Sequence, residues 1–137
     1  MLGADGALIG SRLWATRESL AATSAKRAAL PATGDDTGRS SIFDILRSKN
    51  WPKHLDFRAI RNQLHKKWEG RIDELRANPA AAIDDYLNGV EQGDYDKAHI
   101  TVGQGIGLIN DILPAEQVIR NISEEAQKLL NRADTKA

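Results

Sequence analysis

The sequence contains no cysteine, so disulfide bonds, thiolate nucleophiles and cysteine metal sites are all excluded. Its 19 basic residues balance its 19 acidic residues, so no overall field attracts nucleic acid or anionic lipid. No apolar run approaches the roughly 18 residues of a membrane-spanning helix. The first ten residues also lack the basic start and long apolar centre of a signal peptide. These absences predict a cytoplasmic protein that binds neither nucleic acid nor membranes.

One segment near the N-terminus has the pattern of a buried strand. Ala7, Leu8 and Ile9 form a continuous apolar run that stops at Gly10 and Ser11, as does a strand covered on both faces. It is the only convincing strand in the sequence. Because even a two-stranded ribbon is marginal in water, we expect this strand to belong to a sheet that the sequence itself does not contain.

The rest of the sequence predicts about six helices joined by polar loops. The stretch "SRLW" after Gly10 predicts a short helical turn, and Pro, Gly and Asp predict loops over 31–39 and 93–99. The spacing of Phe57, Ile60, Leu64 and Trp68 indicates one helix with an apolar stripe. The predicted helices cover residues 16–30, from Ser40 or Ser41 to the step at 50–52, 57–68, 73–77, 79–92 and 114–130.

Two glycine-containing segments are candidates for binding a phosphate. Gly103, Gly105 and Gly107 alternate before an apolar run, but a dinucleotide fingerprint needs a preceding strand and an acidic residue roughly 20 positions later, and neither is evident. We therefore interpret these glycines as places where the backbone passes close to another surface. Gly10 and Ser11 are better candidates, because a helix that starts directly after a strand presents free N–H groups to an anion.

The remaining polar and aromatic residues show no pattern of a catalytic or metal site. The three histidines, His54, His65 and His99, lack ligand spacing and are interpreted as surface or loop residues. Trp51 and Trp68 are predicted to anchor the core. The basic residues between positions 58 and 67 are interpreted as the solvated face of a helix, because that helix carries a complete apolar stripe.

Several segments together resemble the nitronate monooxygenase family, formerly called 2-nitropropane dioxygenases. "GADGALIGSRLWATRES" resembles the last barrel strand of that family and the turn that follows it. "FDILRSKNWP", "RAIRNQLHKKWEGR" and "GQGIGLINDILPAEQVI" resemble its C-terminal helical segment, in the same order. The resemblance covers nearly the whole chain, and the order and spacing of the segments make it more specific than any single one.

The resemblance implies an α/β TIM-barrel fold that binds FMN and oxidises alkyl nitronates with O2 without a nicotinamide cofactor. In this family the turn after the eighth strand meets the FMN phosphate, which would place Gly10, Ser11, Arg12 and Leu13 at the cofactor. It also implies that Gly103 to Gly107 pack closely against the barrel, with Gln104 near the flavin pocket. The chain would then supply the last barrel strand and its helix in residues 1–30 and a mainly α-helical C-terminal segment in residues 31–137.

The sequence departs from the family in what it lacks. A complete barrel has eight strands in about 250 residues, whereas one strand is expected here, so the chain would need the missing barrel segment and be inactive alone. Met1 then marks an internal start or an incomplete gene model. No residue of this chain is assigned as catalytic and none as a metal ligand. Two alternatives stay open: a free-standing helical interaction module, and part of another FMN barrel such as an enoyl reductase.

Overall fold

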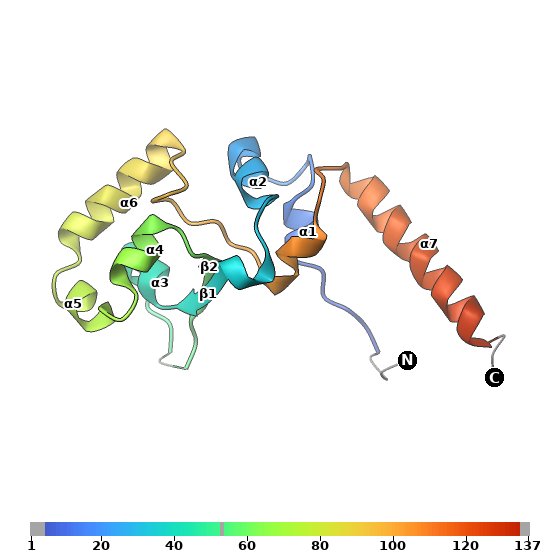
Figure 1. Ribbon diagram of the computed structural model, residues 1–137, viewed down its shortest axis with the longest axis horizontal. Coiled ribbons are helices and arrows are strands. Elements are labelled where there is room, and N and C mark those ends of the chain that lie inside the picture. The colour runs from blue at the N-terminus through green and yellow to red at the C-terminus, as the bar shows by residue number, and fades with distance from the viewer. Residues whose placement is uncertain (1–4, 53, 135–137) are drawn as a thin grey trace.

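A computed structural model describes residues 5–52 and 54–134, which form two short strands and a series of helices (Figure 1). The elements are α1 (Ser11–Trp14), α2 (Thr23–Ala29), the 3-10 turn η1 (Gly34–Asp36), β1 (Thr37–Ser40), α3 (Ile42–Leu46), β2 (Phe57–Ile60), α4 (Gln63–Trp68), α5 (Ile72–Ala77), α6 (Ala80–Gln92), the 3-10 turn η2 (Gln104–Leu108) and α7 (Ala115–Asp134).

Apolar side chains gather in two separate cores. The first lies among α3, β2, α4, α5 and α6, and includes Phe43 and Trp68. The second joins Ala15 and Ala29 to residues 100–109, with Ile106 fully buried. Trp68 therefore anchors the core as predicted, whereas Trp51 is 55% exposed and the prediction for it is wrong.

The two strands form an antiparallel ribbon between the two cores. Thr37 lies opposite Ile60 and Ser40 lies opposite Phe57. The Ile60 N–H donates to the Ile100 carbonyl at 3.0 Å, so the ribbon is also bonded to the segment that builds the second core. Because a two-stranded ribbon is marginal alone, these added contacts account for its presence here.

The prediction of one helix over 57–68 is wrong, since the segment divides into β2 and α4. The Asn62 side-chain oxygen accepts the His65 N–H at 2.9 Å, which caps α4 at its first turn. The Asn62 side-chain amide also donates to the carbonyls of Tyr95 and Ala98. The helix therefore begins after Asn62, and the preceding residues extend to pair with β1. Lys66 and Lys67 on α4 are exposed, as predicted for a solvated face.

Two further predictions near the N-terminus are also wrong, whereas the strand predicted over 7–9 needs a sheet that the described residues do not contain. Ala7, Leu8 and Ile9 form no strand among the described residues, and Leu8 is 98% exposed. The loop predicted over 31–39 contains most of β1. The helix predicted over 16–30 shortens to α2, because Thr16 closes the turn of α1 instead of starting a helix: its hydroxyl donates to the Leu13 carbonyl at 2.8 Å.

The other predicted helices, α3, α5, α6 and α7, are confirmed. Gly93 ends α6 with a left-handed φ of 65°, a conformation that favours glycine. Helix α7 projects from the rest of the molecule at the opposite end from α5 and α6 (Figure 1). No helix within the described residues is long and apolar enough to cross a membrane.

His65 lies inside the first core, so the prediction that it is a surface or loop residue is wrong, whereas His99 lies in a loop beside that core, as predicted. His65 is buried on α4, and its Nε2 lies 2.9 Å from the Ser40 hydroxyl. Half-buried His99 packs edge-on against Phe57 and shares a 2.8 Å hydrogen bond with the Tyr86 hydroxyl. Burial lowers the pKa of both rings. Burial and the nearby Arg47 charge together lower the His99 pKa to about 4.

We expect the free energy of unfolding to fall as the pH falls from about 6.5 towards 4. In that window the unfolded chain binds a proton on His99 that the folded chain does not, so acid favours unfolding. Over this pH window the free energy of unfolding of the variant His99→Gln should fall by roughly 2 kcal/mol less than that of the unsubstituted protein. Urea unfolding followed by tryptophan fluorescence at several pH values measures it. The matched control is His54→Gln at an exposed position; identical profiles for both variants would contradict the assignment.

Candidate functional site

The predicted phosphate-binding turn lies where two distant parts of the chain meet. The Gly103 N–H donates to the Ser11 side-chain oxygen at 2.8 Å, across 92 positions of sequence. Ser11 is the first residue of α1, and Gly103 directly precedes η2. The structure therefore brings the Gly10–Leu13 turn next to Gly103 and Gln104. The two glycine-containing segments that the sequence indicated as candidates thus lie side by side.

The start of α1 is open to an approaching anion. Gly10 is exposed, and a Cβ built on it would meet no atom within 4 Å. The first N–H groups of a helix have no acceptor within the helix, and at α1 these belong to Ser11, Arg12 and Leu13. The Ser11 oxygen accepts from Gly103, so its hydroxyl hydrogen can be donated to a further acceptor. This arrangement fits a phosphate group.

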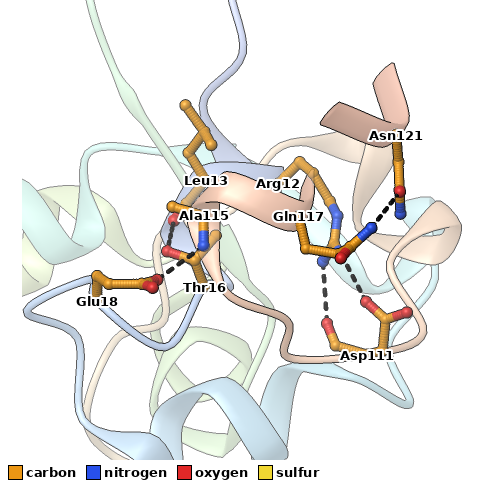
Figure 2. A network of polar contacts seen from close by, with 8 residues as sticks. All are labelled: Arg12, Leu13, Thr16, Glu18, Asp111, Ala115, Gln117 and Asn121. Carbon is orange, nitrogen blue, oxygen red and sulfur yellow. Dashed lines mark hydrogen bonds and ion pairs between the residues drawn. The ribbon is translucent and has the colours of Figure 1, made fainter. Parts of the chain in front are cut away.

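The Arg12 side chain, in contrast, is committed to a second contact across the same junction. Its guanidinium donates to the Asp111 carbonyl at 2.9 Å and forms an ion pair with the Asp111 carboxylate (Figure 2). These contacts use two of the five N–H donors of the guanidinium.

Residues after α1 hold the start of α7. A Glu18 carboxylate oxygen accepts the Ala115 N–H at 2.8 Å (Figure 2), and the Arg17 N–H donates to the Leu113 carbonyl at 3.1 Å. The hydrogen bond from Ala115 lowers the pKa of Glu18. Glu18 thus fills the role of an N-terminal cap for α7. We call the contacts between residues 11–18 and 103–115 the stem.

A buried lysine shapes the loop that carries Glu18. Lys26 on α2 is 2% exposed, and its ammonium group donates to the carbonyls of Thr16 at 2.6 Å and Ser19 at 2.9 Å. These bonds fix the chain on both sides of Glu18. The backbone carbonyls that they engage help to explain why the segment after α1 does not form the predicted helix.

The glycine segment packs against other backbone, as interpreted from the sequence, but not at every position. A Cβ on Gly107 would lie 3.4 Å from Thr33 Cα, and one on Gly103 would lie 3.5 Å from the Ser11 oxygen, whereas Gly105 faces open space. The same segment is also approached closely by Gly34, where a Cβ would lie 2.8 Å from the Gln104 carbonyl oxygen. Gln104 is exposed, one position from the residue that Ser11 binds.

Sequence reasoning found the turn but missed the residues that position it. Glu18, Lys26 and Asp111 all act through backbone groups or through a partner about 100 positions away. No motif or spacing in the sequence signals such contacts. No group of three or more potential metal ligands occurs within the described residues.

The variant Lys26→Met should lower the free energy of unfolding by about 2 kcal/mol, because two carbonyls would lose their buried donor. Arg27→Met is the matched control, since Arg27 is the exposed neighbour on the same helix. Urea unfolding of both variants measures the difference. Equal stability of the two variants would show that the Lys26 bonds do not stabilise this loop.

The variant Glu18→Ala should speed amide hydrogen exchange in the first turn of α7 several-fold, because the Ala115 N–H loses its acceptor. Glu18→Gln keeps an acceptor oxygen, so its exchange rate should lie between those of the unsubstituted protein and Glu18→Ala. Exchange measured by mass spectrometry on peptides covering 113–120 tests this, with Glu124→Ala on the same helix as control. Unchanged exchange at 115 in Glu18→Ala would contradict the cap.

This chain resembles known proteins both in its sequence family and in its fold. A family model described as nitronate monooxygenase matches residues 1–125. The structure is similar to FabK from Thermotoga maritima, with a TM-score of 0.68, 23% identity, and coverage of 93% of this chain and 39% of that one. A FabK mutant from the same organism gives a TM-score of 0.69 and 22% identity, covering 98% of this chain and 37% of that one.

The chain thus spans well under half the length of the FabK chains that it resembles. No curated protein sequence matches it. The structural likeness, at this level of identity, concerns the fold. The match to the family model covers most of the chain, and it shows that the chain belongs to the nitronate monooxygenase family, whose fold is a TIM barrel.

Proposed function

We propose that this chain forms the C-terminal part of an FMN-dependent nitronate monooxygenase, which oxidises alkyl nitronates with O2. The observation that carries the proposal is the open start of α1, held against Gly103 by the Ser11 hydrogen bond. In eight-stranded barrels a phosphate often lies beside the loops after the last two strands and the N-terminus of a short extra helix. Residues 6–14 supply that kind of loop and helix.

Each residue of the turn has a defined part in holding the cofactor phosphate. Ser11, Arg12 and Leu13 would donate backbone N–H groups, and Ser11 would add its hydroxyl. Gly10 leaves room for the phosphate, since nothing lies within 4 Å of where its Cβ would be. Gln104, exposed next to Gly103, would lie near the flavin pocket. Bound FMN would supply the redox chemistry.

The remaining part of the barrel would supply the other side of the phosphate site and the residue that contacts the substrate. Two exposed apolar residues, Leu8 and Ile9, support the presence of such a partner, because they immediately precede the turn and lack cover. A strand in a parallel barrel is buried on both faces. We therefore propose that residues 7–9 become the last strand when the barrel is complete, in the cytoplasm.

An enoyl reductase built on the same type of FMN barrel is the second candidate. The likeness in fold to FabK favours it. The phosphate site does not distinguish the two reactions, because the same turn can serve either substrate.

The test uses the longest reading frame that contains this chain. The purified product should retain FMN, seen in its visible absorbance, and should consume O2 with an alkyl nitronate. Oxidation of a nicotinamide cofactor with an enoyl thioester, without nitronate activity, would favour the reductase. A product that neither retains nor binds added FMN would overturn both candidates and favour a helical interaction module.

Gly10→Asp in that product should weaken FMN binding about tenfold or more, because a carboxylate at the start of α1 repels the phosphate. Aspartate is also a good N-cap residue, so the helix itself should not be lost. Gly6→Asp is the matched control, since Gly6 is equally exposed and uncrowded. Equal FMN affinity in the two variants, measured by fluorescence titration, would remove the phosphate from this turn.

A further inference from the structure

A cavity of about 940 Å³ is lined by α3, by α5 and by the loop that joins α3 to β2. These two helices lie away from α7, toward the other end of the molecule (Figure 1). Ile45, Leu55 and Ile72 supply apolar walls. No described lining residue belongs to the Gly10–Leu13 turn or to 103–115. The cavity is therefore separate from the turn that would hold the cofactor phosphate.

Asp44, on α3, brings an unpaired carboxyl group to this cavity. The residue is 3% exposed, and neither carboxylate oxygen accepts a hydrogen bond from a described residue. Burial raises the pKa of Asp44, although the Trp51 indole, the Arg47 charge and the Phe57 N–H act in the opposite direction. Buried carboxylates are ordinarily paired with a cation or with hydrogen-bond donors. Asp44 therefore indicates a place where a positively charged group can bind.

The other charged side chains of the cavity leave Asp44 unbalanced. Arg39 forms an ion pair with Asp56, and both line the cavity. Arg76 lies 3.5 Å from a carboxylate oxygen of its own helix. Lys49 is exposed, so its ammonium group can stay in water. The charge that lacks a partner inside the cavity is thus negative.

The surroundings of Asp44 favour an organic cation over a metal ion. No group of three or more potential metal ligands occurs in the part of the chain that the structure describes, whereas Ca²⁺ and Mg²⁺ need about six oxygen ligands. Trp51 and Leu55 are 55% and 46% exposed beside the cavity. They offer apolar surface to the body of a ligand, and the face of an indole ring also attracts cations.

We propose that this cavity binds a small organic molecule that carries a primary ammonium group on an apolar body. The ammonium would pair with the Asp44 carboxylate, and the body would lie against Ile45 and Ile72. The exposed Trp51 side chain would turn aside to admit the ligand and then lie over its ammonium group. This site goes beyond the proposed function, because it does not depend on FMN and shares no described residue with the phosphate-binding turn.

The probe is phenethylammonium, which joins an aromatic ring to a primary ammonium group through a short chain. Saturation-transfer difference NMR measures its dissociation constant with the product of the longest reading frame that contains this chain. We expect saturable binding. Hydrocinnamate, an anion with nearly the same apolar body, should bind roughly tenfold more weakly or not at all, because Asp44 attracts only the cation. Equal or tighter binding of the anion, or no saturable binding of phenethylammonium, would overturn the proposal.

Asp44→Asn should weaken the binding of phenethylammonium roughly tenfold or more, because the ligand loses its charged partner. Asp84→Asn is the matched control, since it removes the same charge from an exposed position of α6 outside the cavity. Lys49→Gln should tighten binding about twofold, because a like charge leaves the cavity lining. Equal affinities in Asp44→Asn and Asp84→Asn would remove the ligand from Asp44.

The melting temperature of Asp44→Asn distinguishes a ligand site from an internal contact. An unpaired buried carboxylate does not stabilise the fold, so the variant should melt within about 2 °C of the unsubstituted protein or above it. A fall of about 5 °C or more would mean that Asp44 already holds a partner within the protein, and would contradict the site.

The 137-residue chain and the longer product should bind phenethylammonium with similar affinity. Binding by the short chain alone would show that the rest of the longer product fills the cavity, which would also overturn the proposal. Retention of FMN, read from the absorbance of the same longer product, tests the proposed function separately. Either conclusion can therefore fail while the other stands.

Discussion

The stem between residues 11–18 and 103–115 determines where every other element of the chain can lie. It joins parts of the chain about 100 positions apart through polar contacts, and the apolar second core lies beside them. Closing so long a loop costs chain entropy, although the cost grows only slowly with length. The second core, which packs Ala15 against Ile106, offsets that cost close to the stem. The polar contacts then determine which residues of 11–18 lie opposite which residues of 103–115.

The contacts of the stem also determine which chemical groups the turn before α1 can present. The guanidinium of Arg12 binds Asp111 and the carboxylate of Glu18 binds the Ala115 N–H. The start of α1 itself presents backbone N–H groups and one hydroxyl. Backbone donors on a fixed helix start bind an anion by position, with little change in side-chain order. The chain belongs to the nitronate monooxygenase family and shares its fold with part of FabK.

How much could be predicted from the sequence depends on whether a signal is local. Pro79 and Gly93 delimit α6 by their own backbone preferences, so the helix predicted over 79–92 is confirmed. The start of α1 could be predicted from a glycine between an apolar run and "SRLW". The split of 57–68 could not, because Asn62 binds carbonyls more than 30 positions away. The apolar run before Gly10 has a strand pattern without a strand, since strand pairing needs neighbours that the described residues do not supply.

The stem has a further consequence for how such a protein can change over time. Since its two sides lie together, the residues that run between them start and finish at nearly the same place, which is the arrangement in which insertions are best tolerated. Loops and helices between residues 18 and 103 could be lengthened, shortened or exchanged without moving the turn or α7. The surface that these elements present could thereby change while the turn keeps its position.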